Sequence, residues 1–315
     1  IKNLKKLYST STNVADVFYK CLKKNNVTDV FAYSGGSVMP LIDSLYKSKI
    51  NYYINSHEQN CGHSATGYAK TSNKTGVVLV TSGPGITNMI TPMLDATNDS
   101  TPLVVFSGQV PLNAIGTDAF QEAPAIELSK NVTKWSYQIK EPSEFIRIVN
   151  LAFYIANNGK KGAVHIDIPK CISVSDIKIS SSAVLNNHYD DAYYFNRYNY
   201  INIIDLINNA KKPIIYLGQG CVNYHKILRE FAIKTNIPVT STIHACGIFD
   251  ESHPLSLRWC GMHGSYVANK CLQESDCIIA LGSRFDDRTT GDIKQYAPNA
   301  LKAQKEGTGG IIHVN

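Results

Sequence analysis

The chain has 315 residues, which is enough for two domains of ordinary size, each with its own hydrophobic core. Hydrophobic residues make up 43% of the sequence and charged residues 18%, a balance that fits a globular protein and excludes wholesale disorder. The net charge of +6 comes from scattered basic residues, so we expect no nucleic-acid partner, and no apolar run approaches the roughly 18 residues of a transmembrane helix.

The amino-terminal residues have the composition of a targeting segment. The chain begins with Ile1 rather than Met, from which we expect a processed protein or a fragment of a longer one. Lys2, Lys5 and Lys6 precede a hydroxyl-rich run at residues 9–12, which fits the end of a transit peptide, although no Arg is present there. Taken alone, this segment is a weak indication of import into an organelle.

Five apolar runs of strand length recur between residues 29 and 168. They are rich in Val and Ile and lack a clean alternation of polar and apolar residues, which favours strands buried on both faces. The expected strands are 29–33, 52–54, 76–80, 103–106 and 163–168. Helix-like stretches separate them, at residues 12–25, 38–47, 58–71, 86–98 and 143–157. This alternation predicts a parallel sheet covered by helices.

A polar stretch rich in Ser, Asn and Tyr interrupts the pattern at residues 173–200, and we interpret it as a linker. The alternation then resumes. Strand-like runs are expected at 213–218, 237–242, 276–283 and 309–315, and helices at 224–235 and 263–273. The sequence therefore predicts an α/β fold with two doubly wound parallel-sheet domains, the first at residues 12–172 and a second, smaller one at 201–315.

Ligands of parallel α/β sheets bind beyond the carboxyl ends of the strands. In the first domain the segments that follow strands are 33–37 (YSGGS), 55–60 (NSHEQN), 81–85 (TSGPG) and 107–111 (SGQVP). The glycines of the first and third segments permit a tight turn or the close approach of a ligand. Either segment alone fits a simple turn equally well, but both together at one edge of a sheet favour a ligand-binding cleft.

One carboxylate, Glu58, stands where an expected strand gives way to a helix. A lone glutamate near a helix start is usually solvated and favoured by the helix dipole. The residues that follow are small, including Cys61, Gly62 and Ala65, so this helix is expected to pack on more than one side. An acid held in such surroundings can share a proton with a ligand nitrogen, and Glu58 is therefore the candidate catalytic residue.

Metal sites are not supported by the spacing of the histidines and cysteines. His57 precedes Glu58, but the next histidine, His63, is six residues on, so the metalloprotease pattern HExxH is missing. The eight cysteines form no CxxC pair, and we expect free thiols in a reducing compartment rather than a zinc site or a disulfide framework. We therefore predict no metal ligand in this chain.

Segments of the second domain are candidates for a phosphate-containing ligand. Gly218 and Gly220 follow a strand, but Asn223 stands where the dinucleotide fingerprint has its third glycine, so NAD binding is not supported. The segment 261–265 (GMHGS) opens a helix, where free backbone N–H groups can hold phosphate. The charged run at 284–288 follows a strand and fits either a salt-bridged loop or a dinucleotide site.

Seven stretches, in a family's order and at its spacing, carry a resemblance. They are YSGGSVMPLID, HEQNCGHSATGYAK, GVVLVTSGPGITN, GQVPLNAIGTDAFQEAP, GAVHIDIPK, GMHGSYVAN and GSRFDDRTTG. Over almost its whole length the sequence resembles the acetolactate synthase (acetohydroxyacid synthase) catalytic-subunit family of thiamine-diphosphate enzymes. The ending KEGTGGIIH is most similar to the fungal and other eukaryotic branch, which implies a mitochondrial enzyme, with a plastid or the cytoplasm as alternatives.

The resemblance implies an activity. Pyruvate is decarboxylated and its two-carbon unit is condensed with pyruvate or 2-ketobutyrate, the first common step of branched-chain amino-acid (valine, leucine and isoleucine) biosynthesis. Glu58 matches the family's catalytic glutamate, which shares a proton with N1′ of the cofactor's aminopyrimidine, and Gln121 matches a residue of the reaction pocket. The resemblance also implies a structural FAD, Mg²⁺, a homodimer or homotetramer, and a possible regulatory subunit.

Matches to the family's motifs assign the remaining site residues, and these assignments are expectations from the resemblance alone. Thiamine diphosphate is expected to lie against Tyr33, Gly36, Glu58, Pro84 and Asn88. FAD is expected to contact Lys130, His263, Gly264, Gly282 and Arg284. The substrate channel is expected to include Pro111, Phe120, Lys170, Met262, Asp287 and Arg288.

Four residues depart from the family's pattern. Ser34 and Ser37 stand where the family usually has Pro and Ala. Lys130 replaces an arginine that contacts the flavin, and because lysine keeps the charge but lacks the planar fork, the affinity for FAD is expected to differ. His244 replaces a glutamine, a change for which we have no physical account.

The family's third domain binds the diphosphate and Mg²⁺ through a Gly-Asp-Gly motif followed downstream by Asn. No Gly-Asp-Gly occurs in this chain. The resemblance therefore implies that the chain comprises the first two domains and that Mg²⁺ binds through a third domain absent from it. Because one active site of the family joins the first domain of one subunit to the third domain of another, this chain alone is expected to be inactive.

Two alternatives remain open. Another thiamine-diphosphate enzyme of the same plan, a pyruvate oxidase or an oxo-acid decarboxylase, would form acetyl phosphate or acetaldehyde from pyruvate instead of acetolactate. A non-catalytic two-domain remnant would keep the fold as a binding or regulatory module. A stop codon directly after Asn315 would favour the remnant, whereas a coding extension that contains Gly-Asp-Gly would refute it.

Overall fold

The computed structural model describes residues 11–178 and 197–315. The chain divides between residues 191 and 192 into two compact units, and each is described by itself. Each unit is built around its own parallel sheet, which confirms the α/β architecture expected from the alternating pattern.

The first unit contains a six-stranded sheet in the order β3-β2-β4-β5-β7-β6, and every neighbouring pair is parallel. The central strands β4, β5 and β7 are buried along their whole length. The strands are β2 Asp29–Ala32, β3 Asn51–Ile54, β4 Gly76–Val80, β5 Leu103–Gln109, β6 Trp135–Gln138 and β7 Ala163–Pro169. Strand β6 was not expected, because its four residues are only partly buried and form no apolar run.

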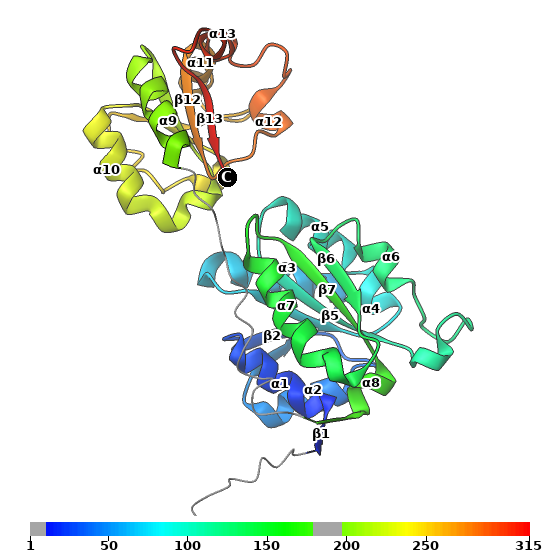
Figure 1. The fold of residues 1–315 in the computed structure, drawn as a ribbon. Coiled ribbons are helices and arrows are strands. Elements are labelled where there is room, and N and C mark those ends of the chain that lie inside the picture. Colours follow the sequence, from blue (N-terminus) through cyan, green and yellow to red (C-terminus); the bar gives the residue numbers. More distant parts are fainter. Residues whose placement is uncertain (1–10, 179–196) are drawn as a thin grey trace, which may run out of the picture. The chain divides into compact units, whose positions relative to one another are not determined.

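Helices cover both faces of this sheet (Figure 1). One face packs against α1 Val14–Lys24, α2 Met39–Ser48, α7 Phe145–Asn157 and α8 Lys170–Val174. The other face packs against α3 Glu58–Ser72, α4 Pro84–Thr87, α5 Ile90–Asn98 and α6 Ala125–Ser129. Successive side chains of a strand point to opposite faces, so Leu79 belongs to the first core and Val78 to the second. In the first core, the rings of Phe18 and Phe106 meet edge to face at 5.1 Å.

The expected linker at residues 173–200 is wrong at both ends. Helix α8 continues to Val174, and strand β8 (Asp176–Lys178) pairs with β1 (Ser11–Asn13) in an antiparallel ladder of the first unit. Helix α9 then begins at Arg197, and residues 179–196 lie outside the described residues. Composition could not reveal β8, because Ile177 is the only apolar residue in this short polar strand.

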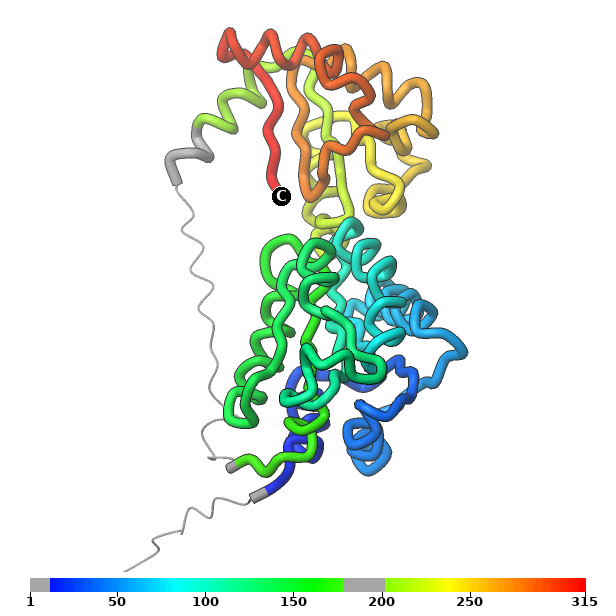
Figure 2. Tube along the Cα trace, turned by 90° about the vertical axis from the view of Figure 1, so that its right-hand side faces the viewer, coloured from blue at the N-terminus to red at the C-terminus, as the bar shows by residue number. Residues whose placement is uncertain are grey.

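The second unit contains a five-stranded sheet in the order β11-β10-β9-β12-β13, again with every neighbouring pair parallel. Figure 2 shows β13, in red, running beside β12 at one edge of this sheet. The strands are β9 Pro213–Leu217, β10 Val239–Ser241, β11 Ser256–Trp259, β12 Cys277–Leu281 and β13 Gly310–Val314. Strand β11 was not expected, because its residues are partly buried or exposed.

Two helices cover each face of the second sheet. They are α9 Arg197–Asn209 and α10 His225–Thr235 on one face, and α11 Tyr266–Glu274 and α13 Pro298–Glu306 on the other. Short elements complete the units: α12 Asp287–Thr290, η1 Leu112–Ala114, η2 Pro142–Glu144, η3 Gln219–Tyr224 and η4 Ile243–Ala245. Among the described helices, none combines the length and the apolar character that crossing a membrane requires.

Candidate active site

Segments that follow the parallel strands of the first unit meet at one edge of the sheet. Ser37, after β2, is buried, and its Oγ lies 2.9 Å from Thr81 Oγ1, after β4. The backbone N–H of Ser82 also donates to Ser37 Oγ, at 3.0 Å. The expected gathering of the segments 33–37 and 81–85 therefore exists, and the serine that departs from the family's alanine holds them together.

Replacing Ser37 by Ala is expected to lower the free energy of unfolding by about 1–3 kcal/mol. The substitution removes the acceptor of the Ser82 N–H and leaves this buried donor without its hydrogen bond. Ser34→Ala is the matched control, because Ser34 is exposed in the same segment and its loss is expected to change stability by less than about 0.5 kcal/mol. Urea unfolding of both variants measures the difference, and equal values would contradict the bridging role of Ser37.

Glu58 opens helix α3 directly after the segment that follows β3. Its side chain is buried, with 7% of the residue exposed, and Oε2 accepts a hydrogen bond of 2.9 Å from Asn88 Nδ2. The His57 ring caps the helix by accepting from the Gln59 N–H at 3.1 Å, which fixes where α3 begins. The predicted pair of Glu58 and Asn88 is thus brought into contact by two different helix termini.

The other residues assigned to thiamine diphosphate lie at the same strand ends. Tyr33 follows β2, is half-buried, and donates its N–H to the Leu79 carbonyl at 3.0 Å. Gly36 is exposed, and no atom lies within 4 Å of the position that a Cβ would take. Pro84 is exposed at the start of α4, and Asn88 caps its end. A buried carboxylate at the strand ends of a parallel sheet is the kind of group that can share a proton with a ring nitrogen of a bound heterocycle.

The loop that carries Phe120 and Gln121 packs against the turn before α4. Gly83 has φ +58°, and a Cβ added there would lie 2.9 Å from the carbonyl oxygen of Gln121. Gln121 itself has φ +61°, a left-handed conformation that is uncommon for a residue with a side chain. The Glu122 carboxylate accepts from the Gly116 N–H at 2.6 Å, which closes the loop. Phe120 is 88% exposed.

Pro111 and Lys170 of the expected substrate channel follow two strands that pair with each other. Gln109 at the end of β5 lies opposite Pro169 at the end of β7. The N–H of Leu112 is 3.4 Å from Cys171 Sγ, so the start of α8 touches the segment after Pro111. The structure therefore brings these two predicted residues to the same edge of the sheet.

Sequence reasoning missed a buried polar network on β5 and β7, made of Ser107, Gln109, His165 and Asp167. Ser107 Oγ donates to Asp167 Oδ1 at 2.6 Å and lies 2.7 Å from His165 Nε2. Gln109 Nε2 donates to Asp167 Oδ2 at 3.2 Å and to the carbonyl of Ala123 at 3.0 Å. The available signal was the alternation of His and Asp inside the apolar run 163–168, which places both on one face of the strand.

Burial sets the charge states in this network. It lowers the pKa of His165 to about 3, so the imidazole is neutral. Because the Ser107 hydroxyl donates to Asp167, His165 Nε2 carries the ring hydrogen and Nδ1 accepts from Ser129 Oγ, 2.7 Å away. Burial also raises the pKa of Asp167 to about 6, opposed by donors that include Gln138 and assisted by the nearby charge of Glu127.

The neutral His165 predicts a specific dependence of stability on pH. As the pH falls from about 6.5 toward 3, the unfolded chain binds a proton at His165 that the folded chain refuses, so the free energy of unfolding decreases by at most about 1.4 kcal/mol per pH unit. Asp167 acts in the opposite sense between about pH 4 and 6, since its folded pKa is raised.

The variant His165→Gln isolates the histidine term, because glutamine can still donate to Ser107 and accept from Ser129. The stability difference between wild type and this variant is expected to shrink as the pH is lowered from 7 to 4.5, since the Asp167 term is common to both proteins and cancels. Urea unfolding at several pH values gives this difference. A difference that stays constant across the range would show that the ring of His165 is not held neutral.

In the second unit, backbones cross closely where β9 and β12 end. A Cβ added to Gly218 would lie 2.1 Å from the carbonyl oxygen of Gly282, and Gly282 has φ +58°. The next residue, Ser283, is 3% exposed, and its Oγ has no hydrogen-bond partner among the described residues. A glycine crossing beside an unpaired buried hydroxyl fits a polar ligand such as a phosphate or ribose group.

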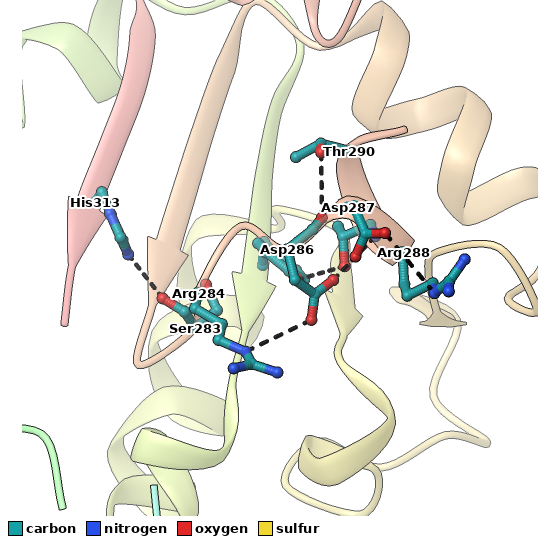
Figure 3. A network of polar contacts seen from close by, with 9 residues as sticks. Ser283, Arg284, Asp286, Asp287, Arg288, Thr290 and His313 are labelled. Carbon is teal, nitrogen blue, oxygen red and sulfur yellow. Dashed lines mark hydrogen bonds and ion pairs between the residues drawn. The ribbon is translucent and has the colours of Figure 1, made fainter. Parts of the chain in front are cut away.

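The charged run after β12 forms a loop of its own ion pairs. Figure 3 shows Arg284 facing Asp286, with Nε 3.6 Å from Oδ2, and His313 Nε2 2.7 Å from the Ser283 carbonyl. Asp286 Oδ1 accepts from the Thr289 N–H at 3.1 Å and so starts α12. The salt-bridged loop that the sequence left open as one interpretation is therefore present, with Arg284 exposed beside the glycine crossing.

The remaining predicted residues divide between the units. Met262 donates its N–H to the Arg288 carbonyl at 2.7 Å, and Arg288 and Asp287 are both exposed on α12. His263 and Gly264 follow Met262, before α11 begins at Tyr266. Lys130, which ends α6, belongs to the first unit.

Two sequence features stand outside this site. His244 lies in η4, and nothing in the structure explains its replacement of glutamine. All eight cysteines are free, and the described residues hold no group of three or more His, Cys, Asp or Glu side chains that could bind a metal.

Comparison with known proteins places both units in one family. Residues 12–128 match the thiamine pyrophosphate enzyme N-terminal TPP-binding domain, and residues 201–315 match the central domain of the same enzymes.

Three curated relatives with names that contain acetolactate synthase illustrate the similarity. The chain is 44% identical to the mitochondrial acetolactate synthase catalytic subunit of Saccharomyces cerevisiae, over 94% of this chain and 45% of that protein. It is 43% identical to the mitochondrial acetolactate synthase of Schizosaccharomyces pombe, over 95% and 46%, and 42% identical to the acetolactate synthase large subunit of Lactococcus lactis, over 93% and 52%. The chain spans about half the length of the curated relatives it matches. It belongs to the thiamine pyrophosphate enzyme family.

Proposed function

We propose that this chain forms the first two domains of an acetolactate synthase catalytic subunit. The activity decarboxylates pyruvate and condenses the two-carbon unit with pyruvate or 2-ketobutyrate, at the start of branched-chain amino-acid biosynthesis. The observation that carries the proposal is the buried carboxylate of Glu58, held by Asn88 at the strand ends of a thiamine pyrophosphate enzyme domain. Relatives named acetolactate synthase in fungi and bacteria support the choice of reaction.

In this proposal Glu58 holds a proton at N1′ of the aminopyrimidine ring. Asn88 donates to one carboxylate oxygen, Oε2, and in this proposal the other oxygen interacts with the ligand. Thiamine diphosphate, when bound, supplies the electron sink for loss of CO₂ and for formation of the new carbon–carbon bond. The loop with Phe120 and Gln121, together with Pro111 and Lys170, is proposed to line the substrate channel, and Lys170 offers a positive charge to the 2-keto acid carboxylate.

The second unit is proposed to hold FAD in a structural role. The backbones of Gly218 and Gly282 cross in close contact where β9 and β12 end, and the unpaired Ser283 Oγ beside them offers a buried polar group. Arg284 is exposed beside them and can pair with the pyrophosphate, and Gly264 precedes a helix start that can accept a phosphate.

The remaining parts of the proposal concern the assembly. Mg²⁺ and the diphosphate are assigned to a third domain, and the functional protein is a homodimer or homotetramer, with a possible regulatory subunit. Mitochondrial location is proposed because the two yeast relatives are named mitochondrial.

Product analysis tests the function. The complete protein, supplied with thiamine diphosphate, Mg²⁺, FAD and pyruvate, is expected to form acetolactate, detected as acetoin after acid decarboxylation. Acetaldehyde or acetyl phosphate as the main product would assign the chain to a decarboxylase or an oxidase of the same family. Absence of any pyruvate consumption by a protein that binds thiamine diphosphate would favour the non-catalytic module.

A further inference from the structure

We infer that Gln109 is a positioning residue that holds the loop carrying Gln121, by tying the carbonyl of Ala123 to the buried carboxylate of Asp167. The inference rests on the proposed function, because Gln121 gives the loop its role in the reaction pocket. Gln109 itself touches neither substrate nor cofactor in this arrangement and acts through the loop.

The side chain of Gln109 has no freedom to move. It is 3% exposed, and each polar atom of its amide is used. Nε2 donates to Asp167 Oδ2 at 3.2 Å and to the carbonyl oxygen of Ala123 at 3.0 Å. Oε1 accepts from the Val110 N–H at 2.8 Å. An amide satisfied on all sides in a buried place has one orientation, and it fixes whatever it bonds.

The other end of this connection is the carboxylate of Asp167, which lies in the most buried part of the sheet. Asp167 is fully buried on β7 and accepts from Ser107 Oγ as well as from Gln109. Ser107 is held in turn by the neutral ring of His165. Strands β5 and β7 pair along seven residues, so the anchor moves only if the centre of the sheet moves.

The loop end of this connection is the carbonyl of Ala123, which lies two residues from Gln121. On its other side the loop rests on Gly83, whose missing side chain admits the backbone of Gln121. Gln121 stays in the left-handed region only because the surroundings determine its conformation. Gly83 on one side and Gln109 on the other hold the loop, and together they keep Gln121 in this conformation. Such positioning matters because misplacement of a reacting or orienting group by about 1 Å can lower the rate on the order of 100-fold.

A matched pair of variants separates positioning from general stability. Gln109→Met and Gln138→Met remove amides that both donate to Asp167 Oδ2, at 3.2 and 2.8 Å, but only Gln109 also reaches the loop. In the complete protein, hydrogen–deuterium exchange of peptides covering residues 112–124 is expected to quicken in Gln109→Met and to stay near wild type in Gln138→Met. Equal exchange of this loop in the two variants overturns the inference.

Kinetics give the second measurement. Gln109→Met is expected to lower kcat for acetolactate formation about 10-fold, with KM for pyruvate changed less than about 3-fold, while Gln138→Met stays within about 2-fold of wild type. In a double-mutant cycle, Gln109→Met added to Gln121→Ala is expected to cost less than 2-fold more, since its effect passes through Gln121. If the loss of kcat in the double variant equals the product of the losses in the two single variants, the inference is overturned.

The outcomes distinguish this inference from the proposed function. If Gln121→Ala leaves acetolactate formation unchanged, the role of Gln121 is wrong and the inference falls with it. If Gln121→Ala lowers activity but the two losses multiply, only the inference is wrong. Should Gln109→Met fail to fold, Gln109→Asn carries the same comparison, because an amide one methylene shorter cannot keep both hydrogen bonds that tie Ala123 to Asp167.

Discussion

Replacing Glu58 by Gln in the complete protein is expected to lower the turnover of pyruvate by about 10²–10⁴-fold, the range for a lost proton-transfer group. Glutamine has nearly the same size, and its amide oxygen can still accept from Asn88. It cannot exchange a proton with a ring nitrogen. The loss is therefore expected in kcat, with stability changed by less than about 1 kcal/mol, because the charge at the start of α3 interacts only modestly with the helix dipole.

The control for this substitution is Glu141→Gln. Glu141 is an exposed carboxylate of the same unit, and its hydroxyl partner, Ser143, can donate to an amide oxygen as well. The turnover of the Glu141→Gln variant is expected to match that of wild type. Turnover of Glu58→Gln within a few-fold of wild type, in a protein that still binds thiamine diphosphate, would remove Glu58 from its assigned role.

Replacing Gly218 by Ala is expected to destabilise the second unit by about 2–3 kcal/mol, as overpacking of a fixed backbone contact does. The added Cβ would stand 2.1 Å from the Gly282 carbonyl oxygen, which belongs to the backbone and cannot rotate away. Hydrogen exchange of peptides from β9 and β12 is expected to quicken by at least about 30-fold where it proceeds through opening of the unit. Because the crossing is also proposed to face FAD, the flavin content of the purified protein is expected to fall.

Gly67→Ala is the matched glycine control. Gly67 is exposed in the middle of α3, and no atom lies within 4 Å of its Cβ position. Alanine there is expected to stabilise the helix by about 0.5–1 kcal/mol, because glycine is the poorer helix former. If Gly218→Ala proved as harmless as this control, the close approach of β9 and β12 would not hold in solution.

The central part of each sheet could be predicted from the sequence, because a strand buried on both faces consists mostly of apolar residues. Strands β4 and β7 and helix α3 lie within a few residues of the expected ranges. The edge strands β6 and β11 could not be predicted, since half-buried residues carry mixed side chains and no period. Helix α13 follows the charged loop and has few buried apolar residues, so it too gave no signal.

The placement of Tyr33 and Glu58 at strand ends could be predicted, because Tyr33 follows β2 at once and Glu58 follows β3 after a short segment. Parallel topology sends all those positions to one edge, whatever the side chains are. The role of Ser37 and the tie from Gln109 to Ala123 were not predictable, because each depends on distances across the sheet between segments far apart in the chain. Polar residues in the buried run 163–168 were the one visible sign of the network behind the loop.

The buried polar network also limits which substitutions this sequence can accept in the course of evolution. Its members are Ser107, Gln109, His165 and Asp167. Each side chain supplies a donor or acceptor that another one needs, so most single replacements strand a hydrogen-bonding group where water cannot reach it. Viable substitutions then have to arrive in compensating sets rather than one by one. A deep mutational scan of β5 and β7 would register this as strong epistasis among four neighbouring positions, surrounded by valines and isoleucines that exchange freely with one another.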